Sequence, residues 1–221
     1  MEPTISIILP VLNEAKTIEC GIAALPSGVE VIIVDGGSAD GTPGIAERAG
    51  GRVTHAERGR GRQMNAGAHL ASGDLLVFLH ADTRLPAQAR SELAAFYGSD
   101  RAWGRFDVRL SGAHPMLRVI SFAMNWRSRL TGICTGDQAI FVRKPVFEEA
   151  GGFADIALME DIEFSQRMKR RSPPFCSRAR VVTSSRRWKK RGIYTTMWLM
   201  WYLRLAYFLG ASPETLARRY Y

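Results

Sequence analysis

The stretch VIIVDGGSADGT, residues 31–42, constrains the fold of this chain more than any other stretch. Four β-branched residues run into Asp35, and a Gly-Gly-Ser turn then leads through Asp40 into a helical pattern. In open α/β sheets, ligands bind outside the carboxyl ends of the strands. Asp35 is therefore either a carboxylate that holds a sugar hydroxyl or the base edge of a nucleotide, or a residue that only caps the turn.

Short apolar runs alternate with helical patterns through the first hundred residues, which predicts parallel βαβ units with right-handed crossovers. The predicted strands there cover residues 5–9, 29–34, 52–56 and 74–79, and the helices begin near residue 13 and cover 40–48, 63–71 and 86–97. Beyond residue 101 the predicted strands are 103–110, 138–142 and 181–183, and the helices are 117–129, 145–150 and 160–171. We expect an α/β fold with a mostly parallel central sheet flanked by helices.

The composition of the chain indicates what kind of partner it binds and in which cellular compartment we expect it. A chain of 221 residues with 46% hydrophobic content can form one domain that buries roughly 70% of its unfolded surface. The net charge of +9 points to an anionic partner, which could be nucleic acid, anionic lipid or a phosphorylated small molecule. Three separated cysteines and an N-terminal apolar run too short for a signal peptide favour a cytoplasmic protein without disulfides or zinc.

The segment LLVFLHADT carries the first candidate for chemistry. His80 and Asp82 follow a predicted strand, and Asp82 shares a sheet edge with Asp35 if both strands are parallel. A carboxylate in that place can hold Mg²⁺ or Mn²⁺, which usually take one or two carboxylates together with substrate phosphates. The alternative is that Asp82 caps the next turn and His80 has a structural role.

Two further segments carry charged candidates. Arg60 and Arg62 lie in GRGRQMNAG before a predicted helix, where arginines and a helix N-terminus both favour anions, although a solvated basic loop has the same composition. Glu160 and Asp161 begin another predicted helix. Neighbouring acids can raise one pKa towards that of a general base, whereas the commoner reason for acids in a first turn is the helix dipole. Asp137 lies in a Gly-Asp-Gln turn before a predicted strand.

The order of these segments is more specific than any one of them. ISIILPVLNE, VIIVDGGSADGT, GDLLVFLHADT, GDQAIFVRKPVFEEAGGF and EDIEFSQRM together resemble the family 2 glycosyltransferases of the GT-A fold. The resemblance covers residues 4–171, or extends to 188 if the Arg187-Trp188 pair is included. It implies an inverting transferase that moves a sugar from a UDP- or GDP-linked donor to an acceptor hydroxyl, with Mg²⁺ or Mn²⁺ as cofactor.

The resemblance also implies roles for individual residues. Asp161 would be the catalytic base, and Asp82 would hold the metal. The donor side would comprise Glu14, Asp35, Arg60, Arg62, His80 and Asp82, and the acceptor side Asp137, Glu160, Arg187 and Trp188. Two motifs depart from the family pattern, because Gly36 follows Asp35 where a second Asp is usual, and His80 stands at the first position of Asp-x-Asp.

The C-terminal segment is predicted to be distinct from the transferase domain, with residues 1–188 forming the domain and 189–221 an apolar and basic helical segment. RRWKKR, residues 186–191, precedes an uncharged stretch rich in Trp, Tyr and Met over 192–203. This pattern favours a helix at a membrane surface and a lipid-linked or lipid-like acceptor. Packing on the domain, a dimer contact and a membrane span remain alternatives.

Two other classes of function stay open. A basic nucleic-acid- or anion-binding protein would share the charge, but aromatic and basic residues do not interleave as in an RNA-binding signature, so we expect no nucleic acid partner. A GT-A scaffold that has lost catalysis would share the fold, but it would not need the carboxylates.

Overall fold

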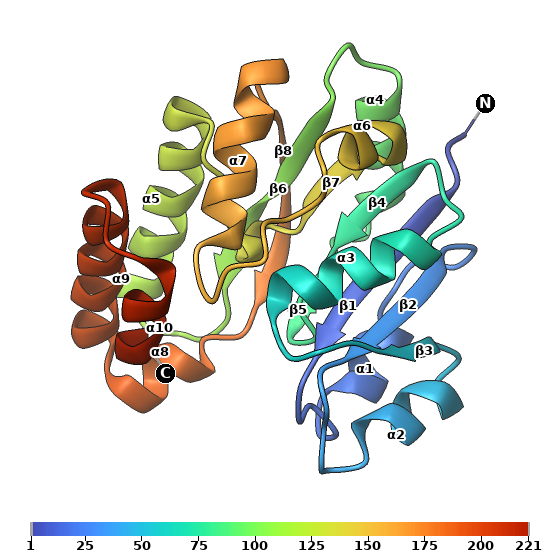
Figure 1. Ribbon diagram of the computed structural model, residues 1–221, viewed down its shortest axis with the longest axis horizontal. Coiled ribbons are helices and arrows are strands. Elements are labelled where there is room, and N and C mark those ends of the chain that lie inside the picture. The colour runs from blue at the N-terminus through green and yellow to red at the C-terminus, as the bar shows by residue number, and fades with distance from the viewer. Residues whose placement is uncertain (1, 221) are drawn as a thin grey trace.

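The computed structural model describes residues 2–220 as one sheet with helices on both faces (Figure 1). The strands are β1 (Ile5–Val11), β2 (Glu30–Asp35), β3 (Arg52–His55), β4 (Leu75–Phe78), β5 (Thr83–Arg84), β6 (Trp103–Leu110), β7 (Ile140–Arg143) and β8 (Phe175–Thr183). The helices are α1 (Ile18–Ala23), α2 (Thr42–Arg48), α3 (Arg60–Leu70), α4 (Ala89–Tyr97), α5 (Pro115–Thr131), α6 (Lys144–Glu149), α7 (Glu160–Arg171), α8 (Arg186–Arg191), α9 (Ile193–Phe208) and α10 (Pro213–Tyr220), with a 3₁₀ turn η1 at Gly136–Gln138.

The sheet has the order β3-β2-β1-β4-β7-β6-β8-β5 and is parallel through its first half. β1 pairs in parallel with β2 and β4, and β2 with β3. β7 is antiparallel to both β4 and β6, β8 is parallel to β6, and β5 is antiparallel to β8. The predicted α/β class is confirmed, and the carboxyl ends of β1, β2 and β4 meet at one edge, as βαβ units require.

The two faces of the sheet are buried by different helices. Alternate side chains of β1 divide between the faces, with Ile7 and Leu9 in the cluster under α1, α2, α4 and α5, and Ile8 in the cluster under α3, α6 and α7. A strand covered on both faces is apolar without alternation. This explains why β1, β2 and β4 are continuous apolar runs in the sequence.

Three elements differ from the predictions. β8 covers nine residues, Phe175–Thr183, rather than residues 181–183, because it pairs with β6 over most of its length. α1 begins at Ile18 rather than near Asn13, whose φ of 55° is incompatible with a right-handed helix. α3 begins at Arg60, so the arginines of GRGRQMNAG lie in its first turn instead of in a preceding loop.

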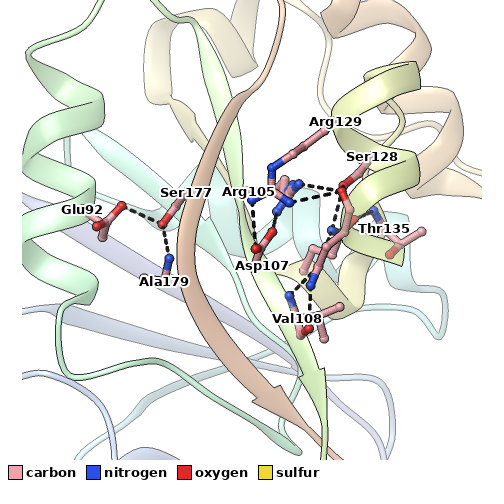
Figure 2. A network of polar contacts seen from close by, with 11 residues as sticks. Glu92, Arg105, Asp107, Val108, Ser128, Arg129, Thr135, Ser177 and Ala179 are labelled. Carbon is pink, nitrogen blue, oxygen red and sulfur yellow. Dashed lines mark hydrogen bonds and ion pairs between the residues drawn. The ribbon is translucent and has the colours of Figure 1, made fainter. Parts of the chain in front are cut away.

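A polar network attaches α5 to β6 (Figure 2). The Asn125 side chain accepts a hydrogen bond from the backbone N–H of Val108 (2.8 Å) and donates one to its carbonyl (2.9 Å). Arg105, which is fully buried, forms an ion pair with Asp107 and donates to the Asn125 carbonyl at 3.1 Å. Asp107 also accepts from Arg129 on α5 at 2.9 Å. These polar contacts hold α5 against β6 in addition to the apolar contacts between them.

The C-terminal helices pack against the rest of the fold through a small apolar cluster. Leu203 of α9 and Leu216 and Tyr220 of α10 are buried in one cluster with Ile133 and Ile162. No helix within residues 2–220 is long and apolar enough to cross a bilayer. The division of the chain at residue 188 stays a prediction.

Candidate active site

A cavity of about 760 Å³ opens at the carboxyl edge of the sheet, and its volume is in the usual range for a ligand site. It lies between the ends of β1, β4 and β8, the starts of α3 and α7, and the C-terminal helices. The predicted site residues that line it are Glu14, Arg60, His80, Asp82, Asp137, Glu160, Asp161, Arg187 and Trp188. Asp35 and Arg62 do not line it. The structure therefore brings together side chains separated by most of the chain.

Asp82 shares a cation with Glu14. The Arg186 guanidinium on α8 lies 3.1 Å from a Glu14 carboxylate oxygen and 3.2 Å from Asp82 Oδ2. Burial opposes the charge of Arg186, but its hydrogen bonds to Glu14 and Asp82 outweigh that effect and raise its pKa. The two carboxylates thus already stabilise positive charge between them.

A divalent metal ion fits this place. No group of three or more His, Cys, Asp or Glu side chains within residues 2–220 is arranged to hold a metal. Mg²⁺ and Mn²⁺ do not need such a group, since they commonly use one or two carboxylates and complete their coordination with water and substrate phosphates. Asp82 and Glu14 can supply those carboxylates once Arg186 moves aside.

Asp35 ends β2 and is almost completely buried. Its Oδ2 accepts hydrogen bonds from the backbone N–H groups of Gly37 (2.9 Å) and Ser38 (3.0 Å), and His55 Nδ1 lies 3.5 Å away. Burial would raise the pKa of Asp35, but the hydrogen bonds from Ser38 and Gly37 and the nearby His55 lower it below its usual value. Oδ1 is buried without a hydrogen-bond partner among the described residues. Asp35 therefore caps its turn and also keeps one acceptor atom unused.

The residue after Asp35, Gly36, packs closely against a buried side chain. A Cβ at Gly36 would lie 3.0 Å from the side chain of Gln63. The Gln63 amide is buried and donates to the carbonyls of Val11 (2.9 Å) and Val34 (2.8 Å), so it joins the ends of β1 and β2. A larger side chain at position 36 would press on this amide, so a second aspartate there would require the amide to shift. The sequence analysis missed Gln63, although it lies within GRGRQMNAG.

The histidine at the second departure contacts the η1 turn. His80 Nδ1 lies 3.4 Å from Asp137 Oδ1, and a Cβ at Gly136 would come within 2.6 Å of His80 Nε2. Desolvation by the cavity walls raises the pKa of Asp137, although its side chain is 46% exposed. The hydrogen bond from His80 and the charges of His80, Arg60 and Arg187 have the larger effect, so the pKa is lower than usual. His80 therefore connects the end of β4 to the η1 turn.

Glu160 and Asp161 stand in different environments at the start of α7. Asp161 Oδ2 accepts from the Gly136 N–H at 2.9 Å, and its Oδ1 accepts from the Ile162 N–H at 2.8 Å. Glu160 is buried with Arg60 Nη1 3.9 Å from its carboxylate, and burial together with the Asp161 charge raises its pKa. The preceding residue, Met159, has a left-handed backbone (φ 72°). Such strain is commonly found at functional sites.

The two arginines in the first turn of α3 lie in different places. Arg60 lines the cavity. Arg62 forms ion pairs with Glu57 and Asp155, the latter at 2.7 Å, and lies outside the cavity. Arg186 also lines the cavity, but it was not among the predicted site residues, because RRWKKR has the composition of a basic surface run.

Sequence similarity identifies the family of the chain. The sequence model described as glycosyl transferase family 2 matches residues 6–149. A PGL/p-HBAD biosynthesis glycosyltransferase of Mycobacterium tuberculosis is 34% identical over 175 residues, which cover 68% of this chain and 63% of the relative. An uncharacterized glycosyltransferase of the same species is 32% identical over 130 residues, covering 57% of this chain and 59% of the relative. The chain thus spans about three fifths of the length of these curated relatives.

Solved structures share the fold at low sequence identity. The mannosyltransferase PcManGT of Pyrobaculum calidifontis, in complex with GDP-Man and Mn²⁺, aligns with a TM-score of 0.65 and 21% identity, covering 99% of this chain and 69% of its own. The glucosyl-3-phosphoglycerate synthase of M. tuberculosis, in complex with Mn²⁺, UDP and its product, aligns with a TM-score of 0.58 and 20% identity, covering 82% of this chain and 71% of its own. The match to the family model covers well over half of the sequence, and the chain belongs to glycosyl transferase family 2, a family of transferase enzymes.

Proposed function

We propose that this chain transfers a sugar from a nucleoside-diphosphate sugar to an acceptor hydroxyl, with inversion at the anomeric carbon. The observation that carries the proposal is that Asp82, at the end of β4, and Asp161, at the start of α7, line one cavity with different partners. Asp82 shares a cation with Glu14, and Asp161 is oriented by two backbone N–H groups. The structural neighbours bound to GDP-Man or UDP with Mn²⁺ support the choice of donor and cofactor.

The residues divide the chemistry between them. A divalent ion held by Asp82 and Glu14 would neutralise charge on the leaving nucleoside diphosphate. Arg60 and Arg186 also line the cavity and add positive charge to it. Asp161 takes the proton of the acceptor hydroxyl, whose oxygen bonds to the anomeric carbon as the bond to the diphosphate oxygen breaks. The electron pair of that bond leaves with the diphosphate, so attack and departure on opposite faces invert the sugar.

Calorimetry of UDP and GDP, each with and without Mn²⁺, tests the donor side. Mn²⁺ should strengthen binding of one of the two nucleotides, and Asp82→Ala should abolish that strengthening. Asp100→Ala is the matched control, because Asp100 is exposed and pairs only with Arg101, away from the cavity. Equal Mn²⁺ enhancement in Asp82→Ala and the wild type would contradict the metal assignment. Hydrolysis of the donor with Mn²⁺ distinguishes an enzyme from an inactive scaffold.

We further propose that the enzyme acts at an anionic membrane surface. The exposed side of α9 carries large apolar side chains at helical spacing, among them Trp198 (65% exposed), Trp201 (63%) and Leu205 (60%). The exposed side of α5 does the same with Phe122 (67%) and Leu130 (70%). Large exposed apolar patches on a folded protein mark interaction sites.

The charge next to this surface favours a membrane as the occupant. α8 has the sequence RRWKKR and runs directly into α9 through Gly192. Basic residues beside an anionic leaflet contribute about 1 kcal/mol each, and interfacial aromatics add apolar burial. An enzyme held at the surface would meet a lipid-linked or lipid-like acceptor there.

Flotation with vesicles tests the membrane proposal. The wild type should float with anionic vesicles at low salt and less at high salt, because the charge contribution is screened. A Trp198→Ser/Trp201→Ser variant should lose flotation, whereas the Asp100→Ala control should keep it. Wild-type protein that stays in solution and sediments as a dimer would instead assign the apolar surface to a second copy of the chain.

A further inference from the structure

Two arginines beside Asp161 lie outside the set predicted from the sequence. Arg204 on α9 lines the cavity, and Arg127 on α5 lies within electrostatic range of both Arg204 and Asp161. Neither guanidinium makes a hydrogen bond or an ion pair within residues 2–220, and Arg127 Nε and Nη2 are shielded from solvent without a partner. The helices that carry them come from distant parts of the chain.

Burying the charges of Arg127 and Arg204 near each other is energetically unfavourable unless an anion lies beside them. Burial, and then the charge of Arg204, lower the pKa of Arg127 to about 10, and burial lowers the pKa of Arg204 as well. Asp161 attracts both guanidiniums, but each of its carboxylate oxygens already accepts a backbone N–H. Buried charged groups are ordinarily paired and hydrogen-bonded. Asp137 also attracts Arg204, but it makes no hydrogen bond to it within residues 2–220, so both arginines keep unused donors near the proposed catalytic base.

We propose that Arg127 and Arg204 form an anion subsite that binds a phosphate group of the acceptor. The inference rests on the proposed function, since it takes Asp161 as the residue that the acceptor hydroxyl approaches. Two guanidiniums match the charge of a phosphate monoester, and their planar donor sets suit its oxygens. The subsite differs from the donor side, where Arg186 lies between Glu14 and Asp82.

The phosphate can belong to a lipid or to a soluble acceptor. The residues next to the two arginines suggest how each kind of acceptor would bind. Trp126 and Leu205 are exposed apolar residues directly adjacent in sequence to Arg127 and Arg204. A phosphorylated lipid could place its head group between the arginines and its chain along α5 and α9. A soluble phosphate monoester would use the arginines alone.

Calorimetry with inorganic phosphate, in the absence of metal, tests the subsite in the 221-residue chain. Arg127→Gln and Arg204→Gln should each weaken phosphate binding about tenfold, as expected for the loss of charge-assisted hydrogen bonds. Arg118→Gln is the matched control, because Arg118 is an exposed arginine of the same helix α5 and does not line the cavity. If Arg186→Gln weakens phosphate binding and Arg204→Gln does not, the phosphate binds on the donor side and the proposal is overturned.

Further variants separate folding and function from the subsite. Arg204→Lys should recover most of the phosphate affinity, which a merely structural role of the guanidinium would not predict. Arg204→Gln should still bind the nucleoside diphosphate with Mn²⁺, so loss of that binding would reflect a failure of the fold rather than of the subsite. An absence of nucleotide binding in the wild type would refute the proposed function and leave the phosphate result standing.

The same variants identify the source of the phosphate. Phosphatidic acid vesicles are compared with phosphatidylglycerol vesicles of equal surface charge. A preference for phosphatidic acid that Arg204→Gln removes assigns a lipid phosphate. Equal binding to both vesicles, together with competition between glycerol 3-phosphate and inorganic phosphate, assigns a soluble phosphate monoester. Arg204→Gln that binds inorganic phosphate and both vesicles as the wild type does would refute the subsite.

Discussion

The buried ion pair beneath α5 allows a quantitative prediction. Arg105 has no exposed side-chain surface, and its partner Asp107 also accepts from Arg129 (Figure 2). Asp107→Ala leaves the Arg105 charge buried without a counter-ion, and the loss of one partner of a buried pair costs about 3–5 kcal/mol. At roughly 2–4 °C per kcal/mol for a domain of this size, the melting temperature should fall by about 10 °C.

Urea unfolding measures this effect directly. The midpoint for Asp107→Ala should decrease with little change in slope, because the native surface is the same. Asp155→Ala is the control, since its ion pair with Arg62 is exposed and such pairs contribute about 1 kcal/mol or less. Arg105→Met combined with Asp107→Ala should recover part of the loss by removing the unpaired charge. A loss below about 1 kcal/mol for Asp107→Ala alone would refute the reasoning.

Three further substitutions test the site. Asp161→Asn should lower sugar transfer about a hundredfold or more while leaving nucleotide binding unchanged, and near-normal turnover would show that another group is the base. Arg186→Gln removes the cation between the two carboxylates, so calorimetry should show tighter binding of Mn²⁺ alone; weaker binding would count against that arrangement. Gly36→Asp collides with Gln63 and should lower the urea midpoint by the equivalent of about 1–3 kcal/mol, whereas an unchanged midpoint would exclude the packing explanation.

Local patterns in the sequence were sufficient for the parallel half of the sheet. β1, β2 and β4 are apolar runs bounded by turn residues, and their shared edge follows from the βαβ rule. That rule placed Asp82 at the same edge as Asp35, and the parallel pairing of β1 with β2 and β4 is what it requires. β8 was predicted too short because its first residues include polar ones that do not form an apolar run. They belong to the strand because they pair with β6, which lies far away in the sequence.

The missing parts of the site arise from long-range packing. Arg186, Arg127 and Arg204 belong to helices whose positions depend on tertiary contacts, so no local pattern distinguishes them from surface arginines. The exposed apolar side of α5 was not predicted either, because the sequence pattern predicted a helix there without assigning its faces. Asp35 and Arg62 were expected in the donor pocket, but the structure places them outside the cavity.

The contact between Arg186 and Glu14 joins residues 172 positions apart in the sequence. It connects the loop after the first strand to the helix that leads into the C-terminal segment. Anything that separates Arg186 from Glu14 and Asp82 also removes a tether on α8, so the amide protons of that short helix should exchange faster when the cavity is filled. Hydrogen exchange along residues 186–191, three of which line the cavity, would then report that the cavity is occupied, even for a ligand whose identity is unknown.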